Sequence, residues 1–159
     1  LYLGASTGGT VSHIHDHVCG AGNHHGGHIV AVDISPRMMR DLVKLSEKRP
    51  GLTPVLADAR KPMAIAPYMR EKATWLHQDL SIGDQAETFV KMTGAFLAQE
   101  GVALLSLKAA SERWMEGGDD ARFEHSKRII EECEHLELIE TIDISVFEEQ
   151  HVVFFCIKK

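Results

Sequence analysis

A glycine-rich turn near the start of the chain carries the clearest chemical signal in the sequence. Residues 1–10 read Leu-Tyr-Leu-Gly-Ala-Ser-Thr-Gly-Gly-Thr, a short apolar segment that runs into glycines and then into a helical pattern. Gly4 and Gly8 would let the backbone pass close to a bound ligand, and the N-terminus of a helix presents free N–H groups. A site for NAD would have a third glycine where this chain has Ser6. The turn therefore predicts a cofactor site, and Ser6 weakens the case for NAD.

Carboxylates follow the next two apolar segments. Asp33 ends the segment Ile29-Val-Ala-Val-Asp33, and Asp58 follows Val55-Leu-Ala57. A carboxylate at the end of such a strand can accept hydrogen bonds from ribose hydroxyls, in the crevice where parallel strands end. An aspartate after a strand is often only a helix cap, so each residue alone is weak evidence. Together, the turn and the two carboxylates predict a site for a nucleoside cofactor.

Three more polar residues lie at the ends of later apolar segments. Asp79 ends Trp75-Leu-His-Gln-Asp79, Lys108 ends Leu104-Leu-Ser-Leu-Lys108, and His151 begins the last segment. Neighbouring strands would bring the Asp79 carboxylate close to the Lys108 ammonium, and one interpretation is a buried ion pair. The other is a lysine that orients a substrate hydroxyl or, when deprotonated, accepts its proton. His151 could complete this polar group, although a single histidine at a strand end is usually structural.

The elements that must position these residues follow an alternating pattern, which is typical of βαβ units and a parallel sheet. Strands are expected near residues 1–3, 29–33, 53–57, 73–78, 102–108, 137–145 and 151–158. Helices are expected near residues 10–18, 36–48, 62–70, 85–99 and 121–135. Ser35-Pro36 predicts a helix start, and Asp84 with Glu87 resembles a capping box.

The last two predicted strands have no helical pattern between them, so they should form an antiparallel hairpin. The sequence therefore predicts an α/β fold with a mostly parallel seven-stranded sheet and a C-terminal antiparallel hairpin. This is the outline of the Rossmann-like fold of S-adenosylmethionine-dependent methyltransferases.

Composition limits the alternatives. The chain has 159 residues, 44% hydrophobic and 25% charged, and is expected to form one domain over residues 1–159. Its apolar runs are shorter than the about 20 residues that cross a bilayer. Three cysteines, odd in number and without metal-site spacing, indicate reduced thiols and a cytoplasmic location.

The net charge of −6 hides a basic block at residues 37–72, with nine Lys and Arg against four Asp and Glu. The block could bind phosphates or be a solvated helix face.

In their order along the chain, the motifs resemble those of the fibrillarin family, and most of all its archaeal members. The likeness extends over residues 1–159. It rests on Tyr2-Leu-Gly-Ala-Ser6 leading to Thr10-Val-Ser-His13, Ala31-Val-Asp-Ile-Ser-Pro-Arg37, Asp58-Ala-Arg-Lys-Pro62, Asp79 through Asp84-Gln85, Ser106-Leu-Lys-Ala109 and Phe147-Glu-Glu-Gln-His151. The Ser-Pro-Arg and Asp-Ala-Arg-x-Pro strings are specific to that family among methyltransferases.

The resemblance implies a catalytic domain that methylates the ribose 2′-hydroxyl of rRNA or tRNA. S-adenosylmethionine would be bound by Gly4, Ala5, Gly8, Thr10, Asp33, Asp58, Ala59, Asp79 and Gln85. Asp33 would bind the ribose, Asp58 and Ala59 would flank the adenine, and Asp79 with Gln85 would face the methionine and the target nucleotide. Three members of the family's Lys-Asp-Lys-His catalytic set are matched by Asp79, Lys108 and His151. RNA phosphates would be contacted by Arg37, Arg40, Arg60 and Lys61.

The resemblance also implies partners and shows departures. The partners would be a box C/D guide RNA, the target RNA, a Nop-type scaffold protein and a kink-turn-binding protein.

The family's N-terminal β-rich domain and its first catalytic lysine are not expected in this chain. The segment 20–28 is unusually rich in histidine and glycine, and with His13, His15 and His17 it could be read as a metal site. We favour exposed histidines and no metal, because methyl transfer needs none and glycines fix no ligand geometry.

Two other functions stay open at this point. The chain could be a methyltransferase of another substrate class, which would act without guide RNA. It could also be an assembly subunit that has kept the fold and lost turnover, which would give no heat on titration with S-adenosylmethionine. The family resemblance places the protein in the cytoplasm of an archaeon or in the nucleolus of a eukaryote.

Overall fold

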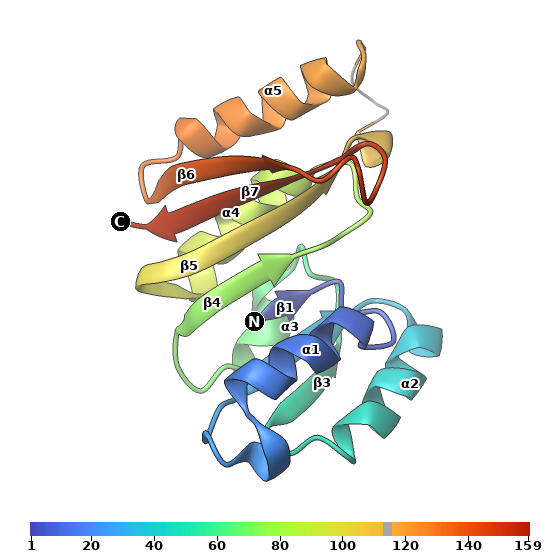
Figure 1. The fold of residues 1–159 in the computed structure, drawn as a ribbon. Helices are drawn as coiled ribbons and strands as arrows, with labels where there is room; N and C mark the ends of the chain where they lie inside the picture. Colours follow the sequence, from blue (N-terminus) through green and yellow to red (C-terminus); the bar gives the residue numbers. More distant parts are fainter. Residues whose placement is uncertain (113–115) are drawn as a thin grey trace. The chain divides into compact units, whose positions relative to one another are not determined.

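The computed structural model describes residues 1–112 and 116–159 of the chain (Figure 1). Its internal contacts divide it into two units, Leu1–Glu71 (unit 1) and Lys72–Lys159 (unit 2). Within the described residues, no helix is long and apolar enough to cross a membrane.

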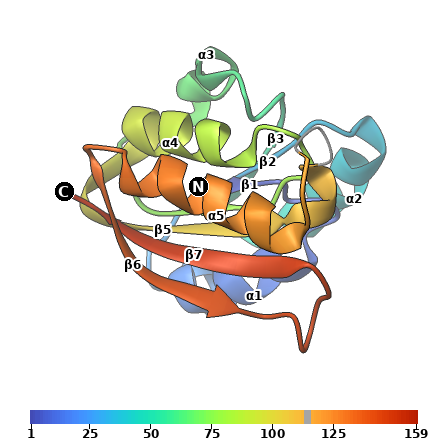
Figure 2. The same ribbon diagram turned by 90° about the horizontal axis from the view of Figure 1, so that it is seen from above.

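Unit 1 contains three parallel strands with β2 in the middle: β1 (Tyr2–Leu3), β2 (Ile29–Asp33) and β3 (Leu52–Leu56). Its helices are α1 (Gly9–Val18), α2 (Pro36–Ser46), α3 (Pro62–Ile65) and the 3₁₀ turns η1 (Ala21–Asn23) and η2 (Ala66–Tyr68). Figure 2 shows α1 and α3 on opposite sides of the three strands. The core between them includes the fully buried side chains of Leu3, Val11, Val32, Leu42 and Ile65. Because the strands are parallel, the residues that follow them lie at one edge of this unit.

Unit 2 contains β4 (Ala73–Gln78), β5 (Leu97–Lys108), β6 (Leu136–Asp143) and β7 (His151–Lys158), in the spatial order β4-β5-β7-β6. β4 and β5 are parallel, and β7 is antiparallel to both β5 and β6. Its helices are α4 (Gln85–Phe96), η3 (Ala109–Ser111) and α5 (Asp119–Glu131). Figure 2 shows α4 and α5 on the same side of these strands. The alternate residues Ala103, Leu105 and Leu107 of β5 are fully buried, as a strand with one covered face requires.

These strands and helices confirm the predicted Rossmann-like α/β fold with its C-terminal antiparallel hairpin. The predicted helix start at Ser35-Pro36 is also confirmed, because the Ser35 hydroxyl accepts the Met38 N–H at 3.4 Å and Pro36 is the first helical residue. Three local predictions differ from the structure for identifiable physical reasons.

The segment 97–99 is a strand, and the prediction of a helix there is wrong. α4 ends at Phe96, and Leu97 has extended backbone angles and pairs with Ala73 of β4. Leu97 is buried as a strand residue, and as a helical residue it would have continued the apolar stripe of α4, so its apolar character could not separate helix from strand. Glu100 has a positive φ of 59° and lies where the register of β5 against β4 shifts, which separates this first part of β5 from the predicted strand.

The predicted helix over residues 62–70 is shorter than expected. The α-helical part ends at Ile65 and continues as the 3₁₀ turn η2. Pro67 explains the change, because it has no N–H to donate within an α-helix. The capping box at Asp84 is also wrong, since the Asp84 side chain makes no cap hydrogen bond and accepts the Thr88 hydroxyl at 3.3 Å.

Burial of His77 predicts a pH-dependent stability. Its Nε2 lies 2.8 Å from the Ser106 hydroxyl, and burial lowers the pKa of the imidazole to about 4. The unfolded chain binds this proton near the ordinary histidine pKa of about 6.5. The free energy of unfolding should therefore fall as the pH decreases from about 6.5 towards 4, by up to about 3 kcal/mol for the full shift.

Urea unfolding at pH 7 and at pH 4.5 measures this effect. The variant His77→Phe should lose much of the difference in the free energy of unfolding between the two pH values. The control His25→Gln, at an exposed histidine, should keep it. An unchanged pH dependence in His77→Phe would show that another group is responsible.

Candidate functional site

In unit 1, the glycine turn is held against the end of β2. The N–H groups of Gly4 and Ala5 both donate to the Val32 carbonyl at 2.9 Å. Gly4 has a φ of 91° and Ser6 a φ of 50°, in the left-handed region that favours glycine. The next N–H, that of Ser6, donates to the Asp33 Oδ2 at 2.7 Å. The serine that departs from the dinucleotide pattern therefore takes part in fixing the turn through its backbone.

Asp33 joins the turn to the start of α2. Besides the bond from Ser6, its Oδ1 accepts the Ser35 N–H at 2.8 Å. Asp33 is half-buried at the end of β2. A carboxylate offers about four acceptor positions, so two backbone bonds leave room for two ribose hydroxyls. The position and the orientation of the Asp33 carboxylate therefore fit the ribose of a nucleoside cofactor.

Gly8 shapes the start of α1. It has a φ of 94° and is the N-cap of the helix, and its N–H donates to the Ala5 carbonyl at 2.9 Å. A Cβ built on Gly8 would lie 2.5 Å from Leu45 Cδ2 and 2.9 Å from Leu42 Cδ1. The close approach of α2 and the positive φ thus both require glycine here. Thr10 is exposed in the first turn of α1, whose N–H groups have no partner within the helix.

Gly8→Ala should therefore lower the free energy of unfolding by about 2 kcal/mol, because alanine is strained at this φ and crowds two leucines. Gly9→Ala is the matched control, since a Cβ on Gly9 meets nothing within 4 Å. Urea unfolding of both variants measures the difference. Equal stabilities of the two variants would contradict this account of the turn.

Asp58 lies in the loop after β3 and is held by Arg60. Its Oδ1 accepts the Arg60 N–H and Nε–H at 3.0 Å, and its Oδ2 accepts the Nη2–H at 3.0 Å. These hydrogen bonds, together with the charge of the guanidinium, lower the pKa of the Asp58 carboxyl. Ala59 between them is buried. The structure thus places Arg60, assigned to RNA in the sequence analysis, against the residue assigned to the adenine.

The other basic residues assigned to RNA are exposed. Arg37 and Arg40 lie on α2 and Lys61 precedes α3. The Arg40 Nε is 3.6 Å from the Asp41 carboxylate, an exposed ion pair that contributes little to stability. These cations are accessible to phosphates.

In unit 2, Asp79, Lys108 and His151 lie at one end of the strands. Lys108 and His151 are directly opposite each other in the β5–β7 register. Opposite residues of an antiparallel pair have Cβ atoms about 5 Å apart on the same face. Asp79 follows the last residue of β4 and interacts electrostatically with Lys108 and His151. The structure therefore brings these three predicted residues together.

The charges around Asp79 shift its protonation. Partial removal of water and the negative charge of Glu148 raise the pKa of its carboxyl, while His151 and Lys108 oppose the shift. His151 donates its Nδ1–H to the Glu149 carbonyl at 2.8 Å, and its Nε2 is 3.4 Å from Glu148 Oε2. The strand hairpin thus adds an acidic residue, Glu148, for which the sequence predicts no role.

Gln85 is fully buried at the start of α4. Its side-chain amide forms hydrogen bonds with the backbone of Lys108 and with the carboxylate of Glu112. The family resemblance implies that Gln85 faces the cofactor and the target nucleotide, and it implies no role for Glu112. These hydrogen bonds join residues that are 23 to 27 positions apart in the sequence. Glu112 is a single glutamate after the turn η3, so no local pattern indicates its contact with Gln85.

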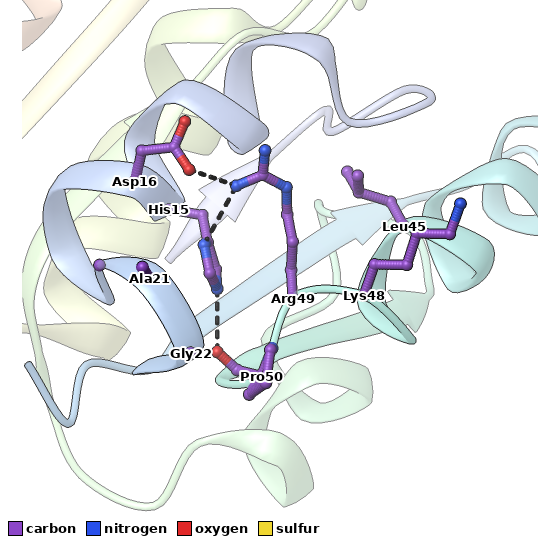
Figure 3. Close-up of a pocket in the computed structure, with 9 residues that line it drawn as sticks. His15, Asp16, Ala21, Gly22, Leu45, Lys48, Arg49 and Pro50 are labelled. Carbon is purple, nitrogen blue, oxygen red and sulfur yellow. Dashed lines mark hydrogen bonds and ion pairs between the residues drawn. The ribbon is translucent and has the colours of Figure 1, made fainter. Parts of the chain in front are cut away.

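A pocket of about 390 Å³ in unit 1 lies where α1 ends (Figure 3). His15 is buried beside it, with 2% of its surface exposed. Its Nε2–H donates to the Pro50 carbonyl at 2.9 Å, and its Nδ1 accepts from Arg49 Nη1 at 3.3 Å. Arg49 also pairs with Asp16. The prediction of exposed histidines is therefore wrong for His15, whose ring joins α1 to the segment before β3.

The other histidines of the predicted group are exposed: His13, His17, His24, His25 and His28. Among the described residues, no group of three or more His, Cys, Asp or Glu side chains could hold a metal ion. The cysteines Cys19, Cys133 and Cys156 are free thiols.

Comparison with solved structures defines the class of fold. The chain superposes with the O-methyltransferase from Bacillus cereus, solved in complex with SAH, with a TM-score of 0.75 over 99% of this chain and 72% of that one. The sequence identity is 9%, so this likeness shows the fold alone. The chain has the Rossmann-like fold of methyltransferases.

Within that class, the chain belongs to the fibrillarin family. The model of the family described as Fibrillarin matches residues 1–159. A fibrillarin-like rRNA/tRNA 2′-O-methyltransferase from Methanopyrus kandleri is 35% identical over 152 residues, which are 96% of this chain and 62% of that protein. The chain thus spans less than two thirds of the length of this curated relative.

Two solved fibrillarins are also similar to the chain. Fibrillarin of Aeropyrum pernix, with natively bound S-adenosyl-L-methionine, is 26% identical with a TM-score of 0.80, over 98% of this chain and 64% of that one. The fibrillarin/Nop5p complex contains a chain that is 25% identical with a TM-score of 0.88, over 99% of this chain and 71% of that one.

Proposed function

We propose that the chain transfers a methyl group from S-adenosylmethionine to the 2′-hydroxyl of a ribose in rRNA or tRNA. The observation that carries the proposal is the Asp33 carboxylate, which two backbone N–H groups orient at the end of β2 beside the glycine turn. This arrangement suits a nucleoside cofactor, and the fibrillarin of Aeropyrum pernix contains S-adenosyl-L-methionine. When bound, the cofactor would supply an electrophilic methyl group on a sulfonium.

The residues of unit 1 would hold the cofactor. Asp33 would accept hydrogen bonds from both ribose hydroxyls, and the first turn of α1 would face the methionine end with free N–H groups. Asp58 and Ala59, in the loop after β3, would flank the adenine. Methyl transfer from a sulfonium is an in-line displacement, so this binding serves mainly to align the methyl group.

The residues of unit 2 would act on the nucleophile. A ribose hydroxyl is a poor nucleophile while it is protonated. Lys108 would orient the 2′-hydroxyl and, as the neutral amine, accept its proton. Asp79 and His151, which interact electrostatically with each other and lie at the same strand ends, would complete the polar surroundings of the hydroxyl.

The exposed basic residues would position the RNA. Arg37, Arg40 and Lys61 would contact backbone phosphates, and a box C/D guide RNA would select the nucleotide. A Nop-type protein would be a partner, since a solved fibrillarin forms a complex with Nop5p. A kink-turn-binding protein would complete the ribonucleoprotein.

Incubation with methyl-labelled S-adenosylmethionine, guide RNA, target RNA, a Nop-type protein and a kink-turn-binding protein tests the proposal. Nucleoside analysis by mass spectrometry should find the label on the 2′-oxygen of one nucleotide, and omission of the guide RNA should remove it. Label on a protein or small molecule without guide RNA would support a methyltransferase of another substrate class. Binding of the RNA partners without heat or thermal shift from S-adenosylmethionine would support a non-catalytic subunit.

A further inference from the structure

Strand β5 extends beyond the end of its neighbour β4, and Lys108 is the last residue of β5. The last paired residues of β4 and β5 are Gln78 and Leu105, so β5 continues for three residues beyond this pair. The next residue, Ala109, donates its N–H to the Gln150 carbonyl at 2.9 Å, on the side of β7. Backbone groups alternate in direction along a strand, so the N–H and C=O of Lys108 point to the other side.

Gln85 takes the place of a strand at this point. The Lys108 N–H donates to Gln85 Oε1 at 3.1 Å, and Gln85 Nε2 donates to the Lys108 carbonyl at 3.1 Å. Such a reciprocal pair has the donor and acceptor pattern of a β-ladder. The side-chain amide thereby holds both backbone groups of Lys108.

Glu112 fixes the orientation of this amide. Its Oε1 accepts Gln85 Nε2–H at 2.9 Å and the Gln85 backbone N–H at 3.3 Å. A carboxylate only accepts hydrogen bonds, so Nε2 of the Gln85 amide must face Glu112. The amide oxygen, Gln85 Oε1, must then face the Lys108 N–H. Both Nε2 hydrogens then have an acceptor. Glu112 is 3% exposed and Gln85 is fully buried, so water competes little for these bonds.

We infer that Glu112 is a positioning residue for Lys108, acting through the side-chain amide of Gln85. The inference rests on the proposed function, because the role of Glu112 is to hold Lys108 where its side chain can reach the 2′-hydroxyl. A rotated amide would place an Nε2–H against the Lys108 N–H and an oxygen against its carbonyl. Loss of the Glu112 acceptor would therefore loosen the end of β5 at Lys108, without removing a group that touches either substrate.

Hydrogen exchange of the Lys108 amide, followed by NMR, tests the positioning without reference to activity. Glu112→Leu removes the acceptor and should speed this exchange by about 10- to 100-fold, the loss expected for a hydrogen bond to a charged group. Glu112→Gln keeps an acceptor and should restore slow exchange. Glu87→Gln, at an exposed residue of α4, the helix that contains Gln85, is the control and should change nothing. Unchanged exchange in Glu112→Leu would overturn the inference.

Steady-state methylation of guided RNA by the same variants tests the consequence for Lys108. Glu112→Leu should lower kcat by about 10- to 100-fold and leave the KM for S-adenosylmethionine unchanged, and Glu112→Gln should restore most of kcat. Faster exchange with an unchanged kcat would also overturn the inference. If the unaltered chain methylates no RNA, the proposed function fails, and the exchange data still decide the positioning.

A measurement on the unaltered chain covers the case in which Glu112→Leu does not fold. A scalar coupling across the hydrogen bond between the Lys108 amide nitrogen and the Gln85 side-chain carbonyl should be detected. Its absence in the folded chain would overturn the inference as well.

Discussion

Lys108→Ala is expected to abolish RNA methylation while leaving the affinity for S-adenosylmethionine nearly unchanged. The lysine side chain lies opposite His151 across the β5–β7 pair and close enough to Asp79 to affect its pKa. Proton transfer by a positioned side chain contributes about 100- to 10,000-fold to a rate, and alanine removes both the orienting and the proton-accepting group. Single-turnover methylation of guided RNA measures the rate, and calorimetric titration measures cofactor affinity.

The control for this variant is Lys91→Ala, at an exposed lysine of α4. It should methylate at the rate of the unaltered chain. Full activity of Lys108→Ala would show that another group activates the hydroxyl. A matching loss of cofactor affinity would instead place Lys108 in the cofactor site.

Asp33→Ala is expected to weaken S-adenosylmethionine binding by about 10- to 100-fold, the loss for hydrogen bonds to a charged group. The substitution has two consequences, because Asp33 also accepts the backbone bonds from Ser6 and Ser35 that hold the turn. Asp41→Ala is the matched control, since Asp41 is a surface aspartate of the same unit that pairs with exposed cations.

A cofactor analogue without ribose hydroxyls separates the two consequences. The unaltered chain should bind the analogue more weakly than S-adenosylmethionine, while Asp33→Ala should bind both with similar affinity. The two proteins and the two ligands form a thermodynamic cycle. The interaction free energy from this cycle measures the contact between Asp33 and the ribose hydroxyls. If Asp33→Ala still discriminates fully between the two ligands, the ribose hydroxyls are bound elsewhere.

Much of the fold could be predicted because its signals are local. Apolar segments and the Ser35-Pro36 helix start give the strands and the beginning of α2. The errors arise where local signals are ambiguous: Leu97 is buried in β5, and the same apolar residue also fits the apolar stripe of a longer α4. At Asp84 the backbone does not adopt a capping geometry, although the residue type favours one.

The candidate site could be predicted in part. The strand ends and glycine turn have sequence patterns, and they indicate Gly4, Asp33 and Lys108. The contacts of Gln85 with Lys108 and Glu112 join residues far apart in sequence, so no local pattern gives them. The burial of His15 has no local signal for the same reason, since its partners Arg49 and Pro50 lie more than 30 residues away. That Gly4, Asp33, Asp58, Asp79 and Lys108 converge on one crevice stays a prediction of the sequence.

Titration of the ¹⁵N-labelled chain with S-adenosylhomocysteine, followed by NMR, tests most directly whether these residues serve one cofactor-dependent reaction. We predict saturable shifts with a single dissociation constant at the amides of Gly4, Ser6 and Asp33, and also at Asp79. Shifts that leave Asp33 untouched, or no saturable shifts at all, would contradict the proposed methyltransferase function.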